Sequence, residues 1–338
     1  MRLSVVIPVY NAEHLLSKCL DSLLDQNLDS NDIEILVVND GSLDSSKEIA
    51  VKNSAVKLID KVNGGVGSAR NAGLEEAIGK YIYFLDPDDY LKTNVLEGLL
   101  DTIETNSLDI LTFDSLTISD SKRSQSIVSN EVSHLSPIVD GENYIANEFY
   151  NNEVWRYIID NEFLKETTIR FIEGRWMEDA IFTAKLFLKA RRMAHLSVDA
   201  HRYLVSPGSA MTSKEPSHYI KVIKDNYNAA LVFNNIINDL KSSKSNNEAC
   251  LNRLRTRQQS FVFFLMVRIL KSTIKLQEVK AILKDLELIK AYPMHKFKGK
   301  DYNGFKYSIL IPLFNKKATY FLLFKIFNPI FRGIYKSA

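Results

Sequence analysis

The sequence predicts an α/β fold in which helices flank a mainly parallel sheet, followed by a helical C-terminal region. In the first half of the chain, short runs rich in β-branched and aromatic residues alternate with segments of helical spacing. A polar loop follows each of the first four runs. After Pro216 the pattern changes to long stretches with apolar residues three or four positions apart. We therefore expect a sheet domain over residues 1–210 and a helical region over residues 211–338.

The expected elements follow in chain order. Strands are predicted where short apolar runs are bounded by polar residues, at 3–9, 33–38, 56–60, 81–85 and 109–113. Helices are predicted between and after them, at 12–25, 42–52, 68–78 and 178–190, and Asp140 is an expected N-cap for a helix that runs to residue 149. Residues 115–133 are polar and rich in serine, which favours a loop. Long helices are expected at 217–240, 247–271 and 276–289.

Composition narrows the class of protein. The chain has 338 residues, of which 46% are hydrophobic and 25% charged, as in ordinary globular proteins. A net charge of only +2 gives no reason to expect nucleic acid as a partner. Cys19 and Cys250 form no metal-ligand or disulfide pattern and are typical of reduced cytosolic thiols. The apolar run at residues 3–9 is too short for a signal peptide or a membrane span, so we expect a cytoplasmic protein.

The last segment, residues 293–338, has a composition of its own. It holds nine Lys or Arg residues against one acid, interleaved with aromatic residues. Such a mixture is typical of a segment that lies on anionic lipid. It is equally typical of an amphipathic helix that packs on the protein while its lysines reach solvent. The sequence leaves both interpretations open.

The fourth apolar run, residues 81–85, ends in the sequence Asp86-Pro87-Asp88-Asp89. Carboxylates this close repel one another unless a cation joins them. Mg²⁺ and Mn²⁺ prefer oxygen ligands, and Mg²⁺ usually keeps substrate phosphates among them. The pattern therefore predicts a metal-held diphosphate. The alternative is a solvated acidic turn, because Asp and Pro are common turn residues.

Polar loops also follow the first three runs, at residues 10–13, 39–42 and 63–71. Ligands of open α/β sheets bind in the crevice at the carboxyl ends of the strands, so these loops and the acidic one predict a nucleotide site. Tyr10 offers a face for a base, and Asp40 can accept a hydrogen bond from a base N–H, which favours UDP, dTDP or GDP donors. Gly65 allows the backbone to approach the nucleotide closely. The Arg70 guanidinium can donate two hydrogen bonds to base or phosphate oxygens. The alternatives are that Tyr10 is a core aromatic, that residues 39–42 form a plain turn and that Arg70 is a surface cation.

Other nucleotide-binding classes fit less well. A dinucleotide fold needs its glycines in the turn after the first strand, where this chain has Tyr-Asn-Ala-Glu. The sequence contains no GxxxxGK[ST] loop and no Cys/His cluster for zinc.

Glu178 and Asp179 begin a predicted helix, whose dipole stabilises carboxylates there. They are candidates for a catalytic base, and helix capping is the alternative.

In this order, VVIPVYNAE, VVNDGS, NGGVGSARNAGL, YIYFLDPDDYL and EGRWMEDAIF resemble family 2 glycosyltransferases of the GT-A fold, over about residues 1–210. The resemblance implies inverting transfer of a sugar from a nucleotide-sugar donor, most readily a UDP-sugar, to an acceptor hydroxyl. It also implies a divalent cation, Mg²⁺ or Mn²⁺, on the diphosphate. Residues 1–115 would bind the donor and residues 135–210 the acceptor. Asn39 departs from the family, which often has a second Asp at this position.

The resemblance assigns roles residue by residue. Asp179 would be the catalytic base, and Asp88 with Asp86 would ligate the metal. The residues expected to hold the donor are Pro8, Tyr10, Glu13, Asp40, Gly65, Arg70, Asp86 and Pro87. The residues expected on the acceptor side are Trp176, Glu178, His201 and Arg202. His201, Arg202 and the following residues 206–209 resemble a family loop that can close near the diphosphate.

The expected acceptor is a saccharide or a lipid-linked saccharide, as in the synthesis of cell-surface polysaccharide or glycolipid. Peripheral contact with the inner face of the cytoplasmic membrane through residues 293–338 would suit such an acceptor. A sugar-nucleotide nucleotidyltransferase is one alternative, but it would need a basic, glycine-rich loop after the first strand. The other is a catalytically silent binding subunit, against which the intact Asp88 and Asp179 argue.

Overall fold

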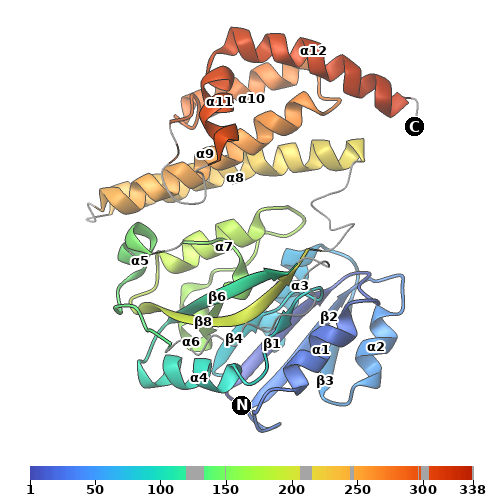
Figure 1. Ribbon diagram of the computed structural model, residues 1–338, viewed down its shortest axis with the longest axis vertical. Coiled ribbons are helices and arrows are strands. Elements are labelled where there is room, and N and C mark those ends of the chain that lie inside the picture. The colour runs from blue at the N-terminus through green and yellow to red at the C-terminus, as the bar shows by residue number, and fades with distance from the viewer. Residues whose placement is uncertain are drawn as a thin grey trace. The chain divides into compact units, whose positions relative to one another are not determined.

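The computed structural model describes residues 1–118, 133–148, 150–205, 215–243, 247–295, 297 and 304–336, with side chains to Phe331. The chain forms two compact units, Met1–Ser209 and Ala210–Ala338 (Figure 1). The roles expected for residues 1–115 and 135–210 stay predictions.

A mixed sheet forms the centre of the first unit. Over the described residues it has eight strands in the order β3-β2-β1-β4-β7-β6-β8-β5 (Figure 1). Four neighbouring strands run parallel, and these are β1 (Leu3–Val9), β2 (Ile33–Asp40), β3 (Val56–Lys61) and β4 (Tyr81–Phe84). They coincide closely with the first four predicted strands, and the α/β prediction is confirmed.

Beyond β4 the sheet is no longer purely parallel. β7 pairs antiparallel with both β4 and β6, and β8 runs parallel to β6 and antiparallel to β5. The bounds of these strands are β5 (Tyr90–Leu91), β6 (Ile110–Ile118), β7 (Tyr157–Asp160) and β8 (Met193–Leu204). The reversed β7 brings the residues before it to the same rim as the carboxyl ends of β4, β6 and β8.

Helices cover both faces of the sheet, which explains why every residue of β1 is buried. Leu3, Val5 and Ile7 share a buried cluster with residues of α1, α2 and α4. On the opposite face, Val6 lies against α3, and Phe84 meets Phe182 of α7 edge to face. The bounds of the helices in this unit are α1 (Leu16–Leu24), α2 (Ser46–Lys52), α3 (Val66–Glu76), α4 (Leu96–Thr105), α5 (Gly141–Asn147), α6 (Asn161–Thr167) and α7 (Glu178–Phe187).

Two local predictions in the first unit have different outcomes. The N-cap at Asp140 is confirmed, since its side chain accepts a hydrogen bond from the Asn143 N–H at 2.8 Å. The loop predicted from residue 115 is wrong for residues 115–118, which extend β6. Pairing with β8 satisfies the backbone there, and strands tolerate polar side chains on a face that meets solvent. Residues 119–132 lie outside the described residues.

The second unit is helical, as predicted. Its described helices are α8 (Pro216–Ser242), α9 (Glu248–Leu270), α10 (Leu276–Leu288), α11 (Phe305–Asn315) and α12 (Lys317–Lys336). Asn247 caps α9 by accepting from the Cys250 N–H at 3.0 Å. Phe263 of α9 lies in the core, where its ring meets Tyr307 and Phe314 of α11. Among the described residues, no helix has the length and the apolar character that crossing a membrane requires.

Candidate active site

The loops after β1 and β2 hold each other at the carboxyl rim of the sheet. The Asn11 N–H donates to Ser42 Oγ at 3.0 Å, and the Leu43 N–H returns a bond to Asn11 Oδ1 at 2.8 Å. Glu13 accepts from the Ser45 N–H at 3.0 Å, at the start of α2. Glu13, expected at the donor, therefore connects the loops after β1 and β2 in this structure.

Asp40 shapes the glycine-rich loop. Its buried carboxylate accepts from the N–H groups of Gly64 at 2.9 Å and Gly65 at 2.8 Å, and from Lys61 Nζ at 2.8 Å. Gly65 has φ of 87°, which suits glycine because it lacks a Cβ. Asp40 thus fixes the loop, and Oδ2, which accepts only from Gly65 among the described bonds, keeps capacity for a further donor.

The two residues at the end of β1 differ in exposure. Pro8 is buried within the strand, opposite Val38 of β2. Tyr10, the first residue after β1, is 51% exposed, so it is not a core aromatic. A ring exposed at this rim is available for stacking on a planar ligand. Asn39 lies buried beside the rim and donates to Asp60 Oδ1 at 2.7 Å, so the residue that departs from the family joins β2 to β3.

Arg70 of α3 joins two acidic segments. It is 4% exposed, and it donates to Asp86 Oδ1 and to Glu178 Oε1, each at 2.8 Å. Asp86 belongs to the acidic loop after β4, whereas Glu178 is the first residue of α7. Arg70 is therefore no surface cation. Its guanidinium connects the acidic loop to the helix that carries Asp179.

Burial and charge oppose each other in this bridge. Burial alone would lower the pKa of Arg70, but the attraction of Asp86 and Glu178 outweighs it and raises the pKa, so the guanidinium stays charged. Burial raises the pKa of Glu178, and Arg70 counters that effect. Removing one partner of such a buried pair leaves an uncompensated charge in the protein.

The segment before α7 is anchored on α3. Asn71 donates to the Phe171 carbonyl oxygen at 3.0 Å and accepts from the Phe171 N–H at 2.9 Å. A Cβ at Gly67 would lie 2.6 Å from the Ile172 carbonyl oxygen, so only glycine allows this approach without a shift. Met177 then adopts φ of 67°, a left-handed conformation that turns the chain into α7. Together these contacts bring the start of α7 to the rim.

Asp179 lies in the first turn of α7 and has the properties of a general base. Its side chain keeps partial exposure, yet the surrounding protein raises its pKa to about 8, chiefly by burial and then by the negative charge of Glu178. Arg70 and the Ala180 N–H, which donates at 2.6 Å, limit the rise. A carboxyl with a pKa near the working pH can both take up and release a proton.

The acidic loop suits a metal that is shared with a substrate. Asp86 and Asp88 are both partly exposed at the rim, with Pro87 between them. Among the described residues, no three or more His, Cys, Asp or Glu side chains gather as a complete metal site. Mg²⁺ usually binds through one or two carboxylates, substrate phosphates and water. These residues therefore fit a divalent cation held jointly with a diphosphate, and they do not form an all-protein cage.

Asp89 points away from the rim and is supported by β8. It accepts from the Leu204 N–H at 2.9 Å, and its Oδ2 lies 3.3 Å from His201 Nε2, both side chains being fully buried. Burial raises the pKa of Asp89 to about 8 and lowers that of His201 to about 3, so both neutral forms are favoured. His201 also stacks on Trp155 with ring centroids 4.2 Å apart.

The acceptor-side predictions therefore fall into two groups. His201 has no exposed surface and lies behind the acidic loop, next to Asp89. Arg202 is 9% exposed and pairs with Asp199. Glu178 is bound to Arg70, which suits a positioning role. Trp176 lies partly exposed two residues before α7. The predicted loop at residues 206–209 lies outside the described residues.

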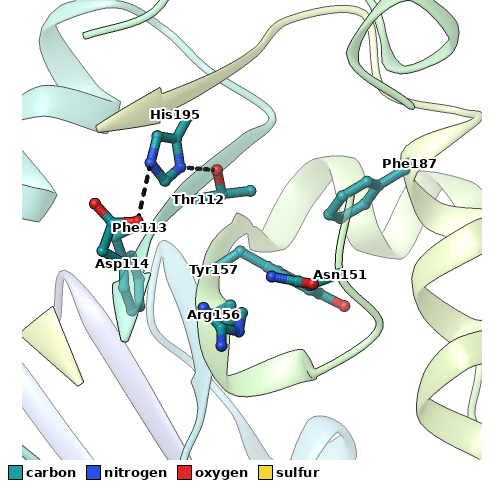
Figure 2. A pocket seen from close by; sticks show the side chains of 8 residues that line it. All are labelled: Thr112, Phe113, Asp114, Asn151, Arg156, Tyr157, Phe187 and His195. Carbon is teal, nitrogen blue, oxygen red and sulfur yellow. Dashed lines mark hydrogen bonds and ion pairs between the residues drawn. The ribbon is translucent and has the colours of Figure 1, made fainter. Parts of the chain in front are cut away.

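A small pocket lies between β6, β8 and the segment that includes the 3-10 helix η2 (Val154–Arg156) (Figure 2). In it, His195 Nδ1 bonds Thr112 Oγ1 at 2.9 Å, while Nε2 lies 3.4 Å from Asp114 (Figure 2). Arg156 and Asn151 face the same space. Sequence reasoning missed this pocket because its residues belong to no motif and come from segments far apart in the chain.

The Arg70 bridge predicts a large effect on stability. Replacing it, Arg70→Met, leaves Glu178 buried without its cation, so we expect the free energy of unfolding to fall by about 3–5 kcal/mol. Arg170→Met, at an exposed cation in the same unit, is the control and should change little. Denaturation followed by fluorescence is suitable, because both tryptophans, Trp155 and Trp176, lie in the first unit. Equal midpoints for the two variants would contradict the bridge.

Comparisons with known proteins identify the family of the chain. A family model described as "Glycosyl transferase family 2" matches residues 4–188. The uncharacterized glycosyltransferase EpsJ of Bacillus subtilis is 31% identical over 240 residues, which is 69% of each protein. A poly(ribitol-phosphate) beta-glucosyltransferase of Bacillus spizizenii is 32% identical over 61% of this chain and 32% of its own length.

A solved structure shares the fold. Residues 1–349 of TarS from S. aureus, in complex with UDP-GlcNAc, superpose with a TM-score of 0.69 at 22% identity, over 98% of this chain and 92% of that one. The fold class expected from the sequence, a GT-A sheet with a helical C-terminal region, is thereby confirmed. The family match covers more than half of the chain, and its boundaries enclose Tyr10, Asp40, Arg70, the acidic loop and Asp179. The chain belongs to glycosyltransferase family 2.

Proposed function

We propose that the chain is an inverting glycosyltransferase that moves a sugar from a UDP-sugar to an acceptor hydroxyl. One observation carries the proposal: Arg70 binds both Asp86 of the acidic loop and Glu178, the neighbour of Asp179. The bridge joins a loop suited to a diphosphate and a cation to a carboxyl suited to proton transfer. A sugar-nucleotide nucleotidyltransferase has no such need for a base beside the diphosphate.

The donor half of the proposal uses residues of the first two loops. Tyr10 provides an exposed ring for the base, next to Pro8 at the end of β1. Asp40 holds the glycine-rich loop and retains a lone pair for a base N–H, which uracil has at N3. The UDP-GlcNAc bound to TarS, which shares this fold, supports a UDP-sugar over dTDP or GDP donors.

For the metal, we propose that Asp88 and Asp86 hold Mn²⁺ or Mg²⁺ together with the donor diphosphate. The cation would offset the negative charge that develops on the departing nucleoside diphosphate. Asp89, held by the Leu204 N–H, would fix the end of the loop that carries these two ligands.

In the transfer step, the acceptor hydroxyl oxygen attacks the anomeric carbon of the donor while the bond from that carbon to the diphosphate breaks. Asp179 takes the hydroxyl proton. Attack from the face opposite the leaving group inverts the configuration, and a single displacement needs only one carboxylate base. Glu178 stays bound to Arg70, and Trp176 is the proposed platform for an acceptor sugar.

The proposed acceptor is a saccharide or a lipid-linked saccharide of a cell-surface polymer. The poly(ribitol-phosphate) beta-glucosyltransferase among the relatives supports a polymer of this class. A cytoplasmic enzyme of this kind would meet such an acceptor at the inner face of the membrane, in peripheral contact through residues 293–338.

The metal proposal is tested with a panel of UDP-, dTDP- and GDP-sugars, by following nucleotide release with Mn²⁺, with Mg²⁺ and with EDTA. We expect a UDP-sugar to be used, and both EDTA and Asp88→Ala to lower turnover by about a hundredfold or more. Asp21→Ala, which removes an exposed carboxylate on α1, is the control and should leave turnover unchanged. Turnover that survives both EDTA and Asp88→Ala would disprove a role for the metal.

The base proposal predicts a pH dependence. Because a protonated carboxyl cannot accept the hydroxyl proton, kcat/KM should fall about tenfold per pH unit below the pKa of Asp179 and level off above about 8. Asp179→Asn should bind UDP as the wild type does and lose transfer. Calorimetry with UDP and a transfer assay across pH check this. An Asp179→Asn variant that retains transfer would exclude Asp179 as the base.

A further inference from the structure

The last two helices each expose a row of apolar side chains. The members of a row are four residues apart, so they follow one side of a helix. The row on α11 is Phe305, Ile309 and Leu313, and the row on α12 is Leu322, Ile326 and Ile330. Their exposed fractions run from 36% to 80%, although such side chains are normally buried.

The core of the second unit does not need these rows. Tyr307 and Phe314 turn inward, where their ring centroids lie 4.9 and 5.8 Å from that of Phe263. Tyr320 is fully buried and donates to the Met266 carbonyl oxygen at 2.9 Å. The apolar residues of the tail thus divide between an inner, aromatic set that packs on α9 and the two exposed rows. Packing on the protein, one of the two interpretations left open by the sequence, is thus confirmed for the inner side of these helices. Contact of the outer side with lipid stays a prediction.

Charge selects the partner for the outer side. The sequence has no Asp or Glu after Asp301, so α11 and α12 contain no carboxylate side chain. Lys306 and Lys325 are both exposed. Lys306 lies seven residues before Leu313, on the side of α11 that carries its row. Lys325 lies three residues after Leu322, on the side of α12 that carries its row. An apolar surface with cations and no acids is complementary to an apolar phase bordered by anionic groups.

We propose that the outer side of α11 and α12 docks on anionic lipid, with the six apolar side chains among the acyl chains and Lys306 and Lys325 at the headgroups. This inference refines the membrane contact of the proposed function and assigns residues to it. It uses no residue of the candidate active site. A surface helix with a long apolar side and lysines at its border is the usual form of an interfacial anchor.

Flotation of the full chain with vesicles tests the proposal. We expect binding to vesicles of phosphatidylcholine mixed with phosphatidylglycerol, weaker binding to phosphatidylcholine alone, and loss of binding as salt is added. Leu322→Glu with Ile326→Glu should lower binding by roughly tenfold or more. The control is Leu288→Glu on α10, which is 74% exposed and should bind as the wild type does.

Three results would overturn the docking surface. The first two are no binding of the wild type to the mixed vesicles, and equal binding by the wild type and the Leu322/Ile326 variant. The third is a dimer in solution that the two substitutions dissociate, in a protein that does not bind vesicles. The last would mean that a second copy covers these helices. Nucleotide release by every variant is measured in parallel. A variant that no longer floats with vesicles but still releases nucleotide bears on docking alone. A wild-type protein that floats with vesicles but releases no nucleotide would count against the proposed activity and would leave the docking proposal unaffected.

Discussion

The buried guanidinium of Arg70 is the constraint on which the site depends. It is bonded to Asp86 and Glu178, which lie 16 and 108 residues away in the chain. Without a cation between them, the acidic loop and the two carboxylates at the start of α7 would repel one another in a poorly solvated space. Arg70 therefore makes it possible to place the acidic loop and Asp179 close together. Because α3 packs on β1, it also ties both to the sheet.

The remaining loops are held by carboxylates that accept hydrogen bonds from backbone N–H groups. Asp40 orders the glycine-rich loop, and Glu13 links the loops after β1 and β2. Asp89 fastens the acidic loop to β8. Acidic side chains that a motif marks as ligand-binding thus shape the site as well, so a substitution at any of them would alter geometry along with ligand contacts.

Much of the fold was predictable, because the buried parallel strands are rich in apolar residues and the polar loops between them stand out. The second half of the sheet was not, since β7 and β8 are short or interrupted by polar residues and become strands only through pairing. The same limit applies to side chains. The sequence indicated that Arg70 and Glu178 matter, but their bond joins distant segments. His201 lies in a family motif, and only the packing of Trp155 and Asp89 shows that it is buried.

The central claim is that Arg70 makes the acidic loop and the start of α7 one energetic unit. A double-mutant cycle on UDP affinity tests it most directly, with Asp86→Asn, Glu178→Gln and the double variant measured by calorimetry in the presence of Mn²⁺. The two carboxylates contact the same guanidinium, so we predict an interaction energy of about 1 kcal/mol or more between the substitutions. Effects that simply add would contradict the claim, because they would show that Arg70 transmits nothing from one segment to the other.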